Sequence, residues 1–446
     1  MMRKPKRKNK NRHSNCVVCD GQRKSRHFNR RLFLKAGGLS LIALGSGGTP
    51  SFLGRLVAQA NAAGITDRRK TLVTIFQRGA MDGLMAVPPL YDDGLRELRP
   101  RLAMSMRGDR VARPLDLGDG YGLHPALAPM APFYSDGRLA IVHGVGSPNK
   151  TRSHFDAQDF METGTPFRKG TESGWLNRAL QQTESNPTPF RAVSLTSSLP
   201  RSLYGPEPSL AIADLTQFKL GGGRGRKIVT PPSGGFESLY EATTVELLRG
   251  TGQESFDAIE TLADLDVSGY QPAAGAEYPQ SPLGRSLRQI AFLIKSQVGL
   301  EVAFAESGGW DTHVQQGTIQ GAFANRARDL AQSIAAFWTD IGNFADDVVL
   351  MTMTEFGRTV HENGSGGTDH GRASCFFVLG RSVDGGKVHG SLPTIRRDDL
   401  EDGRDLPVTT DFRSVFAAVG GGHFGIRDDG ALFPGWDGKR APLLRA

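Results

Sequence analysis

The stretch that decides the fold is VAFAESGGWDTH at residues 302–313. Its first half is a short apolar run, typical of a strand covered on both faces. Its second half places Asp311 and His313 two residues apart, beside glycines. A second stretch, GTDHG at residues 367–371, again joins an aspartate to a histidine. Carboxylate and imidazole groups suit zinc, manganese or iron, so the two stretches indicate a metal centre at the carboxyl end of a sheet.

Similar apolar runs, bounded by glycine or polar residues, recur along the chain. They span residues 71–76, 139–143, 191–195, 302–305, 348–353 and 375–379. Helical patterns lie between them, clearest at residues 287–297 and 327–344. Strands that alternate with helices predict an α/β fold with a mostly parallel sheet.

The middle of the chain has a different composition. Residues 197–282 are rich in Gly, Pro and Ser, which predicts an insertion or cap that lies over the edge of the sheet and is partly helical at residues 236–248. The glycine cluster at residues 221–226 lacks the lysine-serine ending of a phosphate-binding loop. We therefore interpret this cluster as an ordinary loop.

The amino terminus has the order of an export leader. NRRLFLK at residues 29–35 carries paired arginines, a glycine-rich apolar run continues to about residue 54, and AQA at 58–60 or ANA at 60–62 offers a cleavage site. The paired arginines resemble the twin-arginine class, whose machinery exports folded proteins. The alternative is a buried helix behind a chance arginine pair. The apolar run is too interrupted for the roughly 20 apolar residues of a membrane span.

This interpretation divides the chain into a leader, residues 1–60, and a mature domain, residues 61–446, that is periplasmic or secreted. The leader holds fourteen Lys and Arg and one acid, a net charge of +13, whereas the whole chain carries +8. The mature domain is therefore left with −5, which argues against nucleic acid as a partner. Cys16 and Cys19 fall in the leader as a fragment of a metal or redox motif, and Cys375 sits in an apolar run that suits core packing.

Five motifs, in order, carry a family resemblance. They are GAMDGL (79–84), RSHFDAQ (152–158), GWDTH (309–313), TEFGRT (354–359) and GTDHG (367–371). This set resembles DUF1501, a family of exported bacterial proteins grouped with the alkaline-phosphatase-like superfamily of phosphatases and sulfatases. The resemblance implies a doubly wound α/β fold with helices on both faces and a two-metal hydrolytic centre, and it implies no substrate.

The resemblance also implies metal ligands. Asp311 and His313 resemble the pair for one metal, and Asp369 and His370 match the adjacent Asp-His pair for the other. Asp82, after the first strand, resembles an early metal-binding aspartate. The alternative for Asp82 is a turn residue, because Asp-Gly is a strong turn signal.

Three further residues have two interpretations each. Glu355 is either a metal ligand or a residue that orients one. His389 resembles a late histidine ligand, but it also fits a solvated loop. Arg358 either holds a bound oxyanion through its planar guanidinium or pairs with Glu355.

The nucleophile is expected after the second strand, at the start of a helix, where Thr151 and Ser153 stand. A metal would activate the hydroxyl, and the helix amino terminus would favour an anion. Ser153 equally fits a helix cap supported by Asp156. His154 and Asp156 are candidates for metal or substrate contacts, and His124 is either a pocket residue or the residue that begins a helix.

Together these patterns predict an exported metal-dependent hydrolase of phosphate or sulfate esters. One or two zinc, manganese or iron ions would lower the pKa of the hydroxyl or of a bound water and neutralise charge on the ester oxygens. The expected partner is a small or polymer-borne anionic ester. The competing hypothesis is a secreted binding or assembly protein that keeps the fold and one metal without catalysis.

Overall fold

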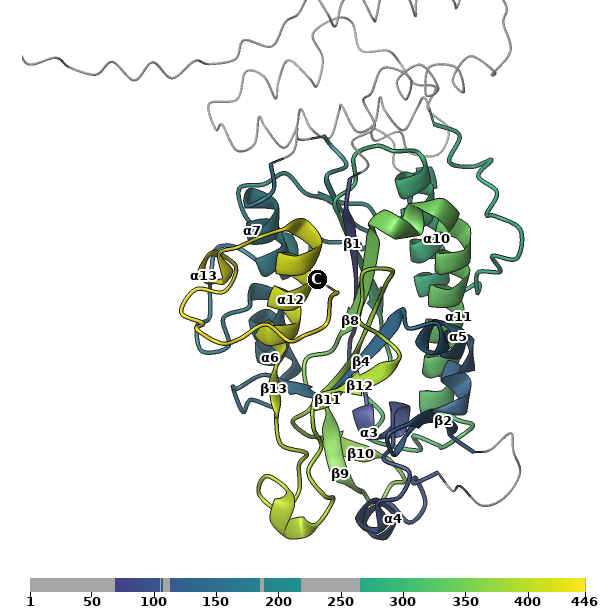
Figure 1. Ribbon diagram of the computed structural model, residues 1–446, viewed down its shortest axis with the longest axis vertical. Coiled ribbons are helices and arrows are strands. Elements are labelled where there is room, and N and C mark those ends of the chain that lie inside the picture. Colours follow the sequence, from purple (N-terminus) through teal and green to yellow (C-terminus); the bar gives the residue numbers. More distant parts are fainter. Residues whose placement is uncertain (1–68, 105, 107–112, 185–187, 218–264, 446) are drawn as a thin grey trace, which may run out of the picture. The chain divides into compact units, whose positions relative to one another are not determined.

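Nine strands form one mixed sheet at the centre of the computed structural model, which describes residues 69–104, 106, 113–184, 188–217 and 265–445. From edge to edge the strands are β12 (Lys387–His389), β4 (Leu139–Gly146), β11 (Ser374–Gly380), β8 (Val348–Met353), β1 (Thr71–Gln77), β7 (Val302–Ser307), β5 (Ala192–Ser194) and β6 (Leu210–Ala211), with β13 (Thr410–Asp411) paired to β4. β11 is antiparallel to β4 and β8, and the other pairs are parallel. The predicted α/β fold with a mostly parallel sheet is confirmed (Figure 1).

The central strands are buried on both faces, as their continuous apolar sequences predict. β1 is buried throughout, and its side chains alternate between two cores: Val73 and Ile75 face one, Leu72 and Phe76 the other. Each of the six predicted apolar runs lies within or overlaps a strand of this sheet.

Helices cover both faces of the sheet. One face carries α5 (Ala131–Ser135), α10 (Pro282–Lys295) and α11 (Ala322–Ile341), and the other carries α6 (His154–Thr163), α7 (Trp175–Gln181), α12 (Phe412–Phe424) and α13 (Asp429–Leu432) (Figure 1). The two helical patterns found in the sequence correspond to α10 and to α11 with the short turn that follows it. Ser281 begins α10 by accepting a hydrogen bond from Gly284 N, as a serine cap should.

Smaller elements complete the described chain. They are α3 (Gly83–Ala86), α4 (Asp93–Leu98), the pair β2 (Leu115–Gly118) and β3 (Tyr121–Leu123), the pair β9 (Arg358–Glu362) and β10 (Thr368–His370), and the 3₁₀ turns η2 (Pro125–Met130), η3 (Arg201–Leu203), η4 (Leu215–Gln217), η5 (Gly342–Asp347) and η6 (Arg397–Asp399). β9 and β10 lie beyond the end of β11 in Figure 1. This hairpin brings the second Asp-His motif to the end of the sheet.

Two regions named in the sequence analysis fall partly or wholly outside the described residues. The leader at residues 1–60, with its arginine pair, cleavage sites and Cys16 and Cys19, lies outside them, as does the centre of the proposed insertion at 218–264. The start of that insertion supplies β6, an edge strand of the main sheet. Among the described residues, no helix is both long and apolar enough to cross a bilayer.

Candidate metal centre

Three neighbouring parallel strands, β8, β1 and β7, form the base of the site at their carboxyl ends. Glu355 follows β8, Gly79 follows β1 and Asp311 follows β7. Gly79 has a φ of +113°, and a Cβ there would lie 2.6 Å from Asp311 N. A glycine is required because only its bare backbone fits this close approach. The three strand ends therefore pack together at the edge where α/β proteins gather their ligands.

The hairpin β9–β10 adds the second Asp-His motif beside the first. Thr368 N donates to Thr312 O at 3.2 Å, which joins the two motif loops through their backbones. A Cβ on Gly367 would lie 2.3 Å from His313 O. The glycine in the sequence GTDHG thus allows the loops to meet, although they are more than fifty residues apart.

The start of α6 supplies a third histidine, His154. Ser153 occupies the N-cap position, but its side chain makes no capping hydrogen bond. The Phe356 ring packs against the rings of His154 and His370, with both centroid separations at 5.0 Å. This apolar contact limits the rotation of the two imidazoles.

Three imidazoles and one carboxylate converge at this place. His370 Nε2 lies 3.0 Å from His154 Nε2, 2.9 Å from His313 Nε2 and 3.2 Å from Asp311 Oδ1. Asp311 is also 3.1 Å from His313 Nε2 and 3.6 Å from His154 Nε2. His154, Asp311 and His370 place ligand atoms that all lie within 4.8 Å of one another, and His313 joins them through its contacts with His370 and Asp311.

The second nitrogen of each imidazole shows how the ring is protonated. Nδ1 of His154 faces Glu355 Oε1 at 2.7 Å, Nδ1 of His313 faces Asp369 Oδ1 at 2.9 Å, and Nδ1 of His370 faces the Arg152 carbonyl at 3.0 Å. Carboxylates and carbonyls only accept hydrogen bonds, so each Nδ1 carries the hydrogen. In the neutral rings, the Nε2 lone pairs of His154 and His313 then both face Nε2 of His370, and Arg358 Nη1 lies 3.5 Å from His313 Nε2. Hydrogen-bonded Nδ1 and free Nε2 is the usual state of a metal-binding histidine.

The spacing of these atoms fits a small cation. Ligand atoms at about 2.0–2.1 Å from a tetrahedral zinc ion lie about 3.3 Å from each other. The separations from His370 Nε2 and from the Asp311 oxygens run from 2.9 to 3.6 Å, with Oδ1 facing His370 and His313 and Oδ2 facing His154. His154, Asp311 and His370 each place a ligand atom within 4.8 Å of the others. The donor set, neutral imidazole with one carboxylate, also suits manganese or iron.

The charges of the site favour a divalent ion. Asp311, Glu355 and Asp369 bring three negative charges, and the buried guanidinium of Arg358 brings one positive charge at 2.8 Å from Asp311 Oδ1. Arg404, whose charge also acts on Asp369, adds a second positive charge, and the group keeps a net negative charge that a cation would offset. Of the three carboxylates only Glu355 is fully buried, and a buried charge is costly unless it is compensated.

The carboxyl groups around the cluster are held ionised. Burial alone raises the pKa of Glu355, but hydrogen bonds from His154, Gln158 and Gly79 outweigh it, and the pKa is lowered. Burial also raises the pKa of Asp311, but the positive charges of Arg358 and His313 outweigh burial. The pKa of Asp311 is therefore lowered as well. The pKa of Asp369 is lowered chiefly by its hydrogen bond with His313.

The histidines of the site differ in proton affinity. The hydrogen bond to Glu355 raises the pKa of His154 above its ordinary value, despite burial. Burial, followed by the charge of His154, lowers the pKa of His370. Without a metal, a proton on His154 would separate the facing nitrogens. A metal must displace that proton, so binding should release it.

Several residues named from the sequence meet here, but not all of them face the volume. Asp311, His313 and His370 do, whereas Glu355 and Asp369 stand behind His154 and His313 as orienting carboxylates. His154, considered in the sequence only for additional contacts, is the fourth member of the cluster. The signal for it was its place at the start of a helix after the second strand.

Asp82 lies elsewhere and is already neutralised. Arg99 Nη1 donates to its Oδ2 at 2.8 Å, Gln316 Nε2 donates to the same oxygen at 2.7 Å, and Met85 N donates to Oδ1. Both Asp82 and Arg99 are 1% exposed. A guanidinium thus occupies the position of the cation that the sequence assigned to this carboxylate. Asp82 also caps α3, which agrees with the alternative of a turn residue.

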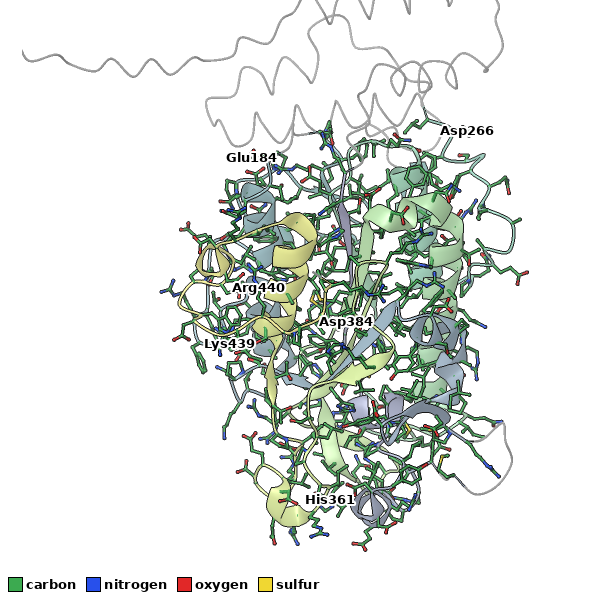
Figure 2. The ribbon with its side chains drawn as sticks, viewed as in Figure 1. Glu184, Asp266, His361, Asp384, Lys439 and Arg440 are labelled. Atoms are coloured by element: carbon green, nitrogen blue, oxygen red, sulfur yellow. The ribbon has the colours of Figure 1, made fainter. Side chains whose placement is uncertain are left out.

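His389 does not join the cluster either. It lies on the edge strand β12, and its Nε2 donates to the Asp384 carbonyl at 2.9 Å. Asp384 is marked in Figure 2, well apart from His361 on β9, the strand that pairs with β10 in the hairpin. His389 therefore lies on a short edge strand, and within the described residues it makes no hydrogen bond or ion pair with a cluster member.

Both terminal nitrogens of Arg358 are occupied, whereas its buried Nε–H has no hydrogen-bond partner among the described residues. Its Nη2 donates to Asp311 Oδ1 and to the Trp310 carbonyl, and its Nη1 donates to the Thr368 carbonyl. It pairs with Asp311 rather than with Glu355, the partner considered from the sequence. The side chain is fully buried, so it orients a ligand and does not present a free fork to an oxyanion.

The candidate nucleophiles lie beside the cluster, in the turn before α6. Thr151 Oγ1 accepts from Ser153 N at 3.2 Å, and Ser153 is exposed. Asp156 pairs with Lys169 instead of supporting a cap. His124 begins η2 by accepting from Ala126 N, which agrees with the interpretation of a residue that begins a helix.

The chain belongs to the family described as a protein of unknown function, DUF1501, whose pattern matches residues 140–434. All four members of the cluster lie in this range. A comparison with curated proteins found no match.

Solved structures with similar folds include two from named bacteria. The C-terminal periplasmic domain of EcEptC from Escherichia coli, in complex with Zn, has 11% identity and a TM-score of 0.34 over 70% of this chain and 73% of that chain. The PsFucS1 sulfatase from Pseudoalteromonas sp. has 11% identity and a TM-score of 0.36 over 89% and 78%. Ps i-CgsB in complex with k-i-k-neocarrahexaose has 7% identity and a TM-score of 0.39 over 84% and 75%.

Proposed function

We propose that this chain is an exported metal-dependent hydrolase of phosphate or sulfate esters. The observation that carries the proposal is the convergence of three imidazole Nε2 atoms and the Asp311 carboxylate at the carboxyl edge of the sheet. A divalent cation held there would act as a Lewis acid on an ester oxygen and lower the pKa of a water or hydroxyl. Because the described residues contain one such group, we propose one metal per chain.

The surroundings of the cluster suit an anionic ester. The four members are 21–45% exposed at their side chains, so a ligand has access. The helix α6 begins at His154, and its first internal hydrogen bond is donated by Ala157 N. The peptide N–H groups of the first turn and the helix dipole therefore favour a negative group beside the cluster.

Ser153 is the better of the two candidate nucleophiles. Its hydroxyl is exposed at the N-cap, next to His154, and is not used in a cap. The Thr151 hydroxyl already accepts the Ser153 N–H. Attack by a water is the other route, and both require the cluster.

A binding or assembly protein without catalysis is the second candidate. One observation favours it: the carboxylates closest to the cluster are engaged, Glu355 by His154 and Asp369 by His313. Neither is placed as a base beside Ser153. Such a protein would use the metal to hold an anionic group without cleaving it.

Export rests on the leader. Its paired arginines, apolar run and small-residue cleavage sites support delivery by the twin-arginine machinery to the periplasm or the exterior. Replacing Arg30 and Arg31 with lysine should leave the protein in the cytoplasm, as measured by cell fractionation. Export of that variant at the normal rate would contradict this part of the proposal.

The activity is tested with residues 61–446, supplied with zinc, manganese or iron, against phosphate and sulfate monoesters and diesters. We expect turnover of one ester class that His370→Ala abolishes. His389→Ala is the matched control, because this histidine lies on β12 away from the cluster. Metal binding with no turnover of any ester would favour the binding protein.

A further inference from the structure

A buried hydrogen-bond network lies behind the metal centre and joins its two motif loops. Gln316, which is fully buried, holds two threonine hydroxyls on its Oε1: Thr312 Oγ1 at 2.9 Å and Thr368 Oγ1 at 2.7 Å. Thr312 stands between Asp311 and His313, and Thr368 stands two residues before His370. One amide oxygen therefore ties both loops that carry cluster members.

The other end of the same amide fixes its orientation. Gln316 Nε2 donates to Asp82 Oδ2 at 2.7 Å. An ionised carboxylate only accepts, so Nε2 must face Asp82 and Oε1 must face the hydroxyls. A glutamine is the residue that offers a donor at one end and an acceptor at the other. Both threonine hydroxyls can then donate to the same oxygen.

The ion pair Asp82–Arg99 anchors this amide to the rest of the fold. Arg99 donates through Nη1 and Nη2 to the Asp82 carboxylate, and through Nε and Nη2 to the carbonyls of Val360 and Thr359 on β9. β9 is the partner strand of β10, which carries His370. The network is thus attached to the first strand end, to the hairpin and to both loops.

We propose that Gln316, oriented by the Asp82–Arg99 pair, is a positioning residue of the metal centre. It acts through Thr312 and Thr368, and it sets the separation of Asp311 and His313 on one loop from His370 on the other. The proposal rests on the metal centre and not on ester hydrolysis. The positioning role of Gln316 explains why Asp82, which touches no cluster member, is buried as a charged residue beside the site.

The test is the affinity for zinc and cobalt of the variant Gln316→Met, whose side chain has a similar size and no amide. Competition with a chelator gives the affinity, and the absorption of bound cobalt reports its coordination. We expect the affinity to fall by about 10–100-fold, the range for residues that orient metal ligands, with an altered cobalt spectrum. A purely structural role would lower the thermal stability of the metal-free protein and leave both readouts unchanged.

Gln77→Met is the matched control. Gln77 is also fully buried at the end of β1, and its side-chain amide meets no hydrogen-bonding group within the described part of the chain. This variant should bind metal like the unaltered protein. If Gln316→Met does not fold, Thr368→Val removes one of the two hydroxyls with little change of shape and should weaken binding less.

The outcomes separate the two claims. Weakened binding in Gln316→Met and normal binding in Gln77→Met support the positioning role. Equal binding in both overturns it and leaves the metal centre standing. An unaltered protein that binds neither zinc nor cobalt overturns both the positioning role and the metal centre.

Discussion

Two sets of histidines in this chain use opposite ring nitrogens. His124, His143 and His423 are buried in the body of the domain, and each donates Nε2–H to a backbone carbonyl at 3.0 Å. For His124 and His143, Nδ1 accepts a backbone N–H one or two residues ahead. Both ring nitrogens of His124 and His143 therefore have a hydrogen-bond partner within the protein.

The histidines of the metal centre are arranged in reverse. In His154, His313 and His370 the Nδ1–H is donated, and Nε2 of His154 and of His313 both face Nε2 of His370. Lone pairs at about 3 Å repel unless a proton or a cation lies between them. The difference teaches that burial alone does not mark a functional histidine, whereas the choice of tautomer does.

The largest expected effect is a loss of stability at low pH, and it sharpens the comparison of the two sets of histidines. Burial lowers the pKa of His124, His143 and His423 to about 4. As pH falls below about 6.5, the unfolded chain takes protons that the native rings refuse, so stability is lost down to about pH 4. Each histidine contributes up to about 3 kcal/mol to this loss. Urea unfolding of the metal-free protein across pH 4–7.5 measures it.

A single variant isolates one of these rings. His423→Gln should flatten the loss of stability between pH 6.5 and 4, because the amide can still donate to the Thr71 carbonyl but does not titrate. An unchanged pH profile would mean that the ring does not remain neutral in the native protein. Protonation of surface carboxylates affects both proteins alike.

The second effect concerns the other set of rings. His370→Ala removes the nitrogen that contacts both other imidazoles, and metal affinity should fall by more than about 100-fold, beyond the usual cost of losing an orienting partner. Thermal stability of the metal-free protein should change little or rise, because repulsion between lone pairs is relieved. Calorimetric titration with zinc checks the affinity, with His389→Ala as the control.

A smaller effect on metal affinity is expected for Glu355, which contacts His154 from behind the cluster. Glu355→Gln keeps the shape of the buried side chain but removes the charge that holds the His154 Nδ1–H. We expect metal affinity to fall by about 10–100-fold. The competing proton on His154 should bind less tightly too, so fewer protons are released on metal binding. Proton release on metal binding is measured in two buffers. A release that Glu355→Gln leaves unchanged would contradict this account.

The smallest effect should come from Asp369→Asn. This carboxylate is 54% exposed, whereas that of Glu355 is fully buried, and solvent screens its interaction with His313. Affinity should fall by about 10-fold or less. A loss larger than that of Glu355→Gln would indicate that Asp369 binds the metal directly, as its sequence motif first indicated.

The sequence predicted the sheet well because buried parallel strands have continuous apolar sequences. Residues 71–76 and 348–353 show this most plainly, and each became a strand of nearly the same extent. It did not predict that β11 runs antiparallel, since an apolar run carries no sign of its direction. The site could be predicted in outline because Asp311, His313 and His370 lie in glycine-bounded motifs.

The remaining roles depend on contacts between distant residues. The guanidinium that neutralises Asp82 comes from Arg99, seventeen residues later, and no spacing rule connects the two. Glu355 and Asp369 have the chemistry of ligands, and only the placement of His154 and His313 in front of them shows that they orient instead. The sequence indicated His154 only as a candidate for metal or substrate contacts. Its place in the cluster is known from the structure.

The most direct test of the central claim is X-ray absorption of the zinc-loaded protein, residues 61–446. We predict one zinc per chain, bound by three imidazole nitrogens and a carboxylate oxygen at about 2.0–2.1 Å, with one imidazole fewer in His370→Ala. A spectrum without imidazole scattering, or one that His370→Ala leaves unchanged, would contradict a metal centre at this edge of the sheet.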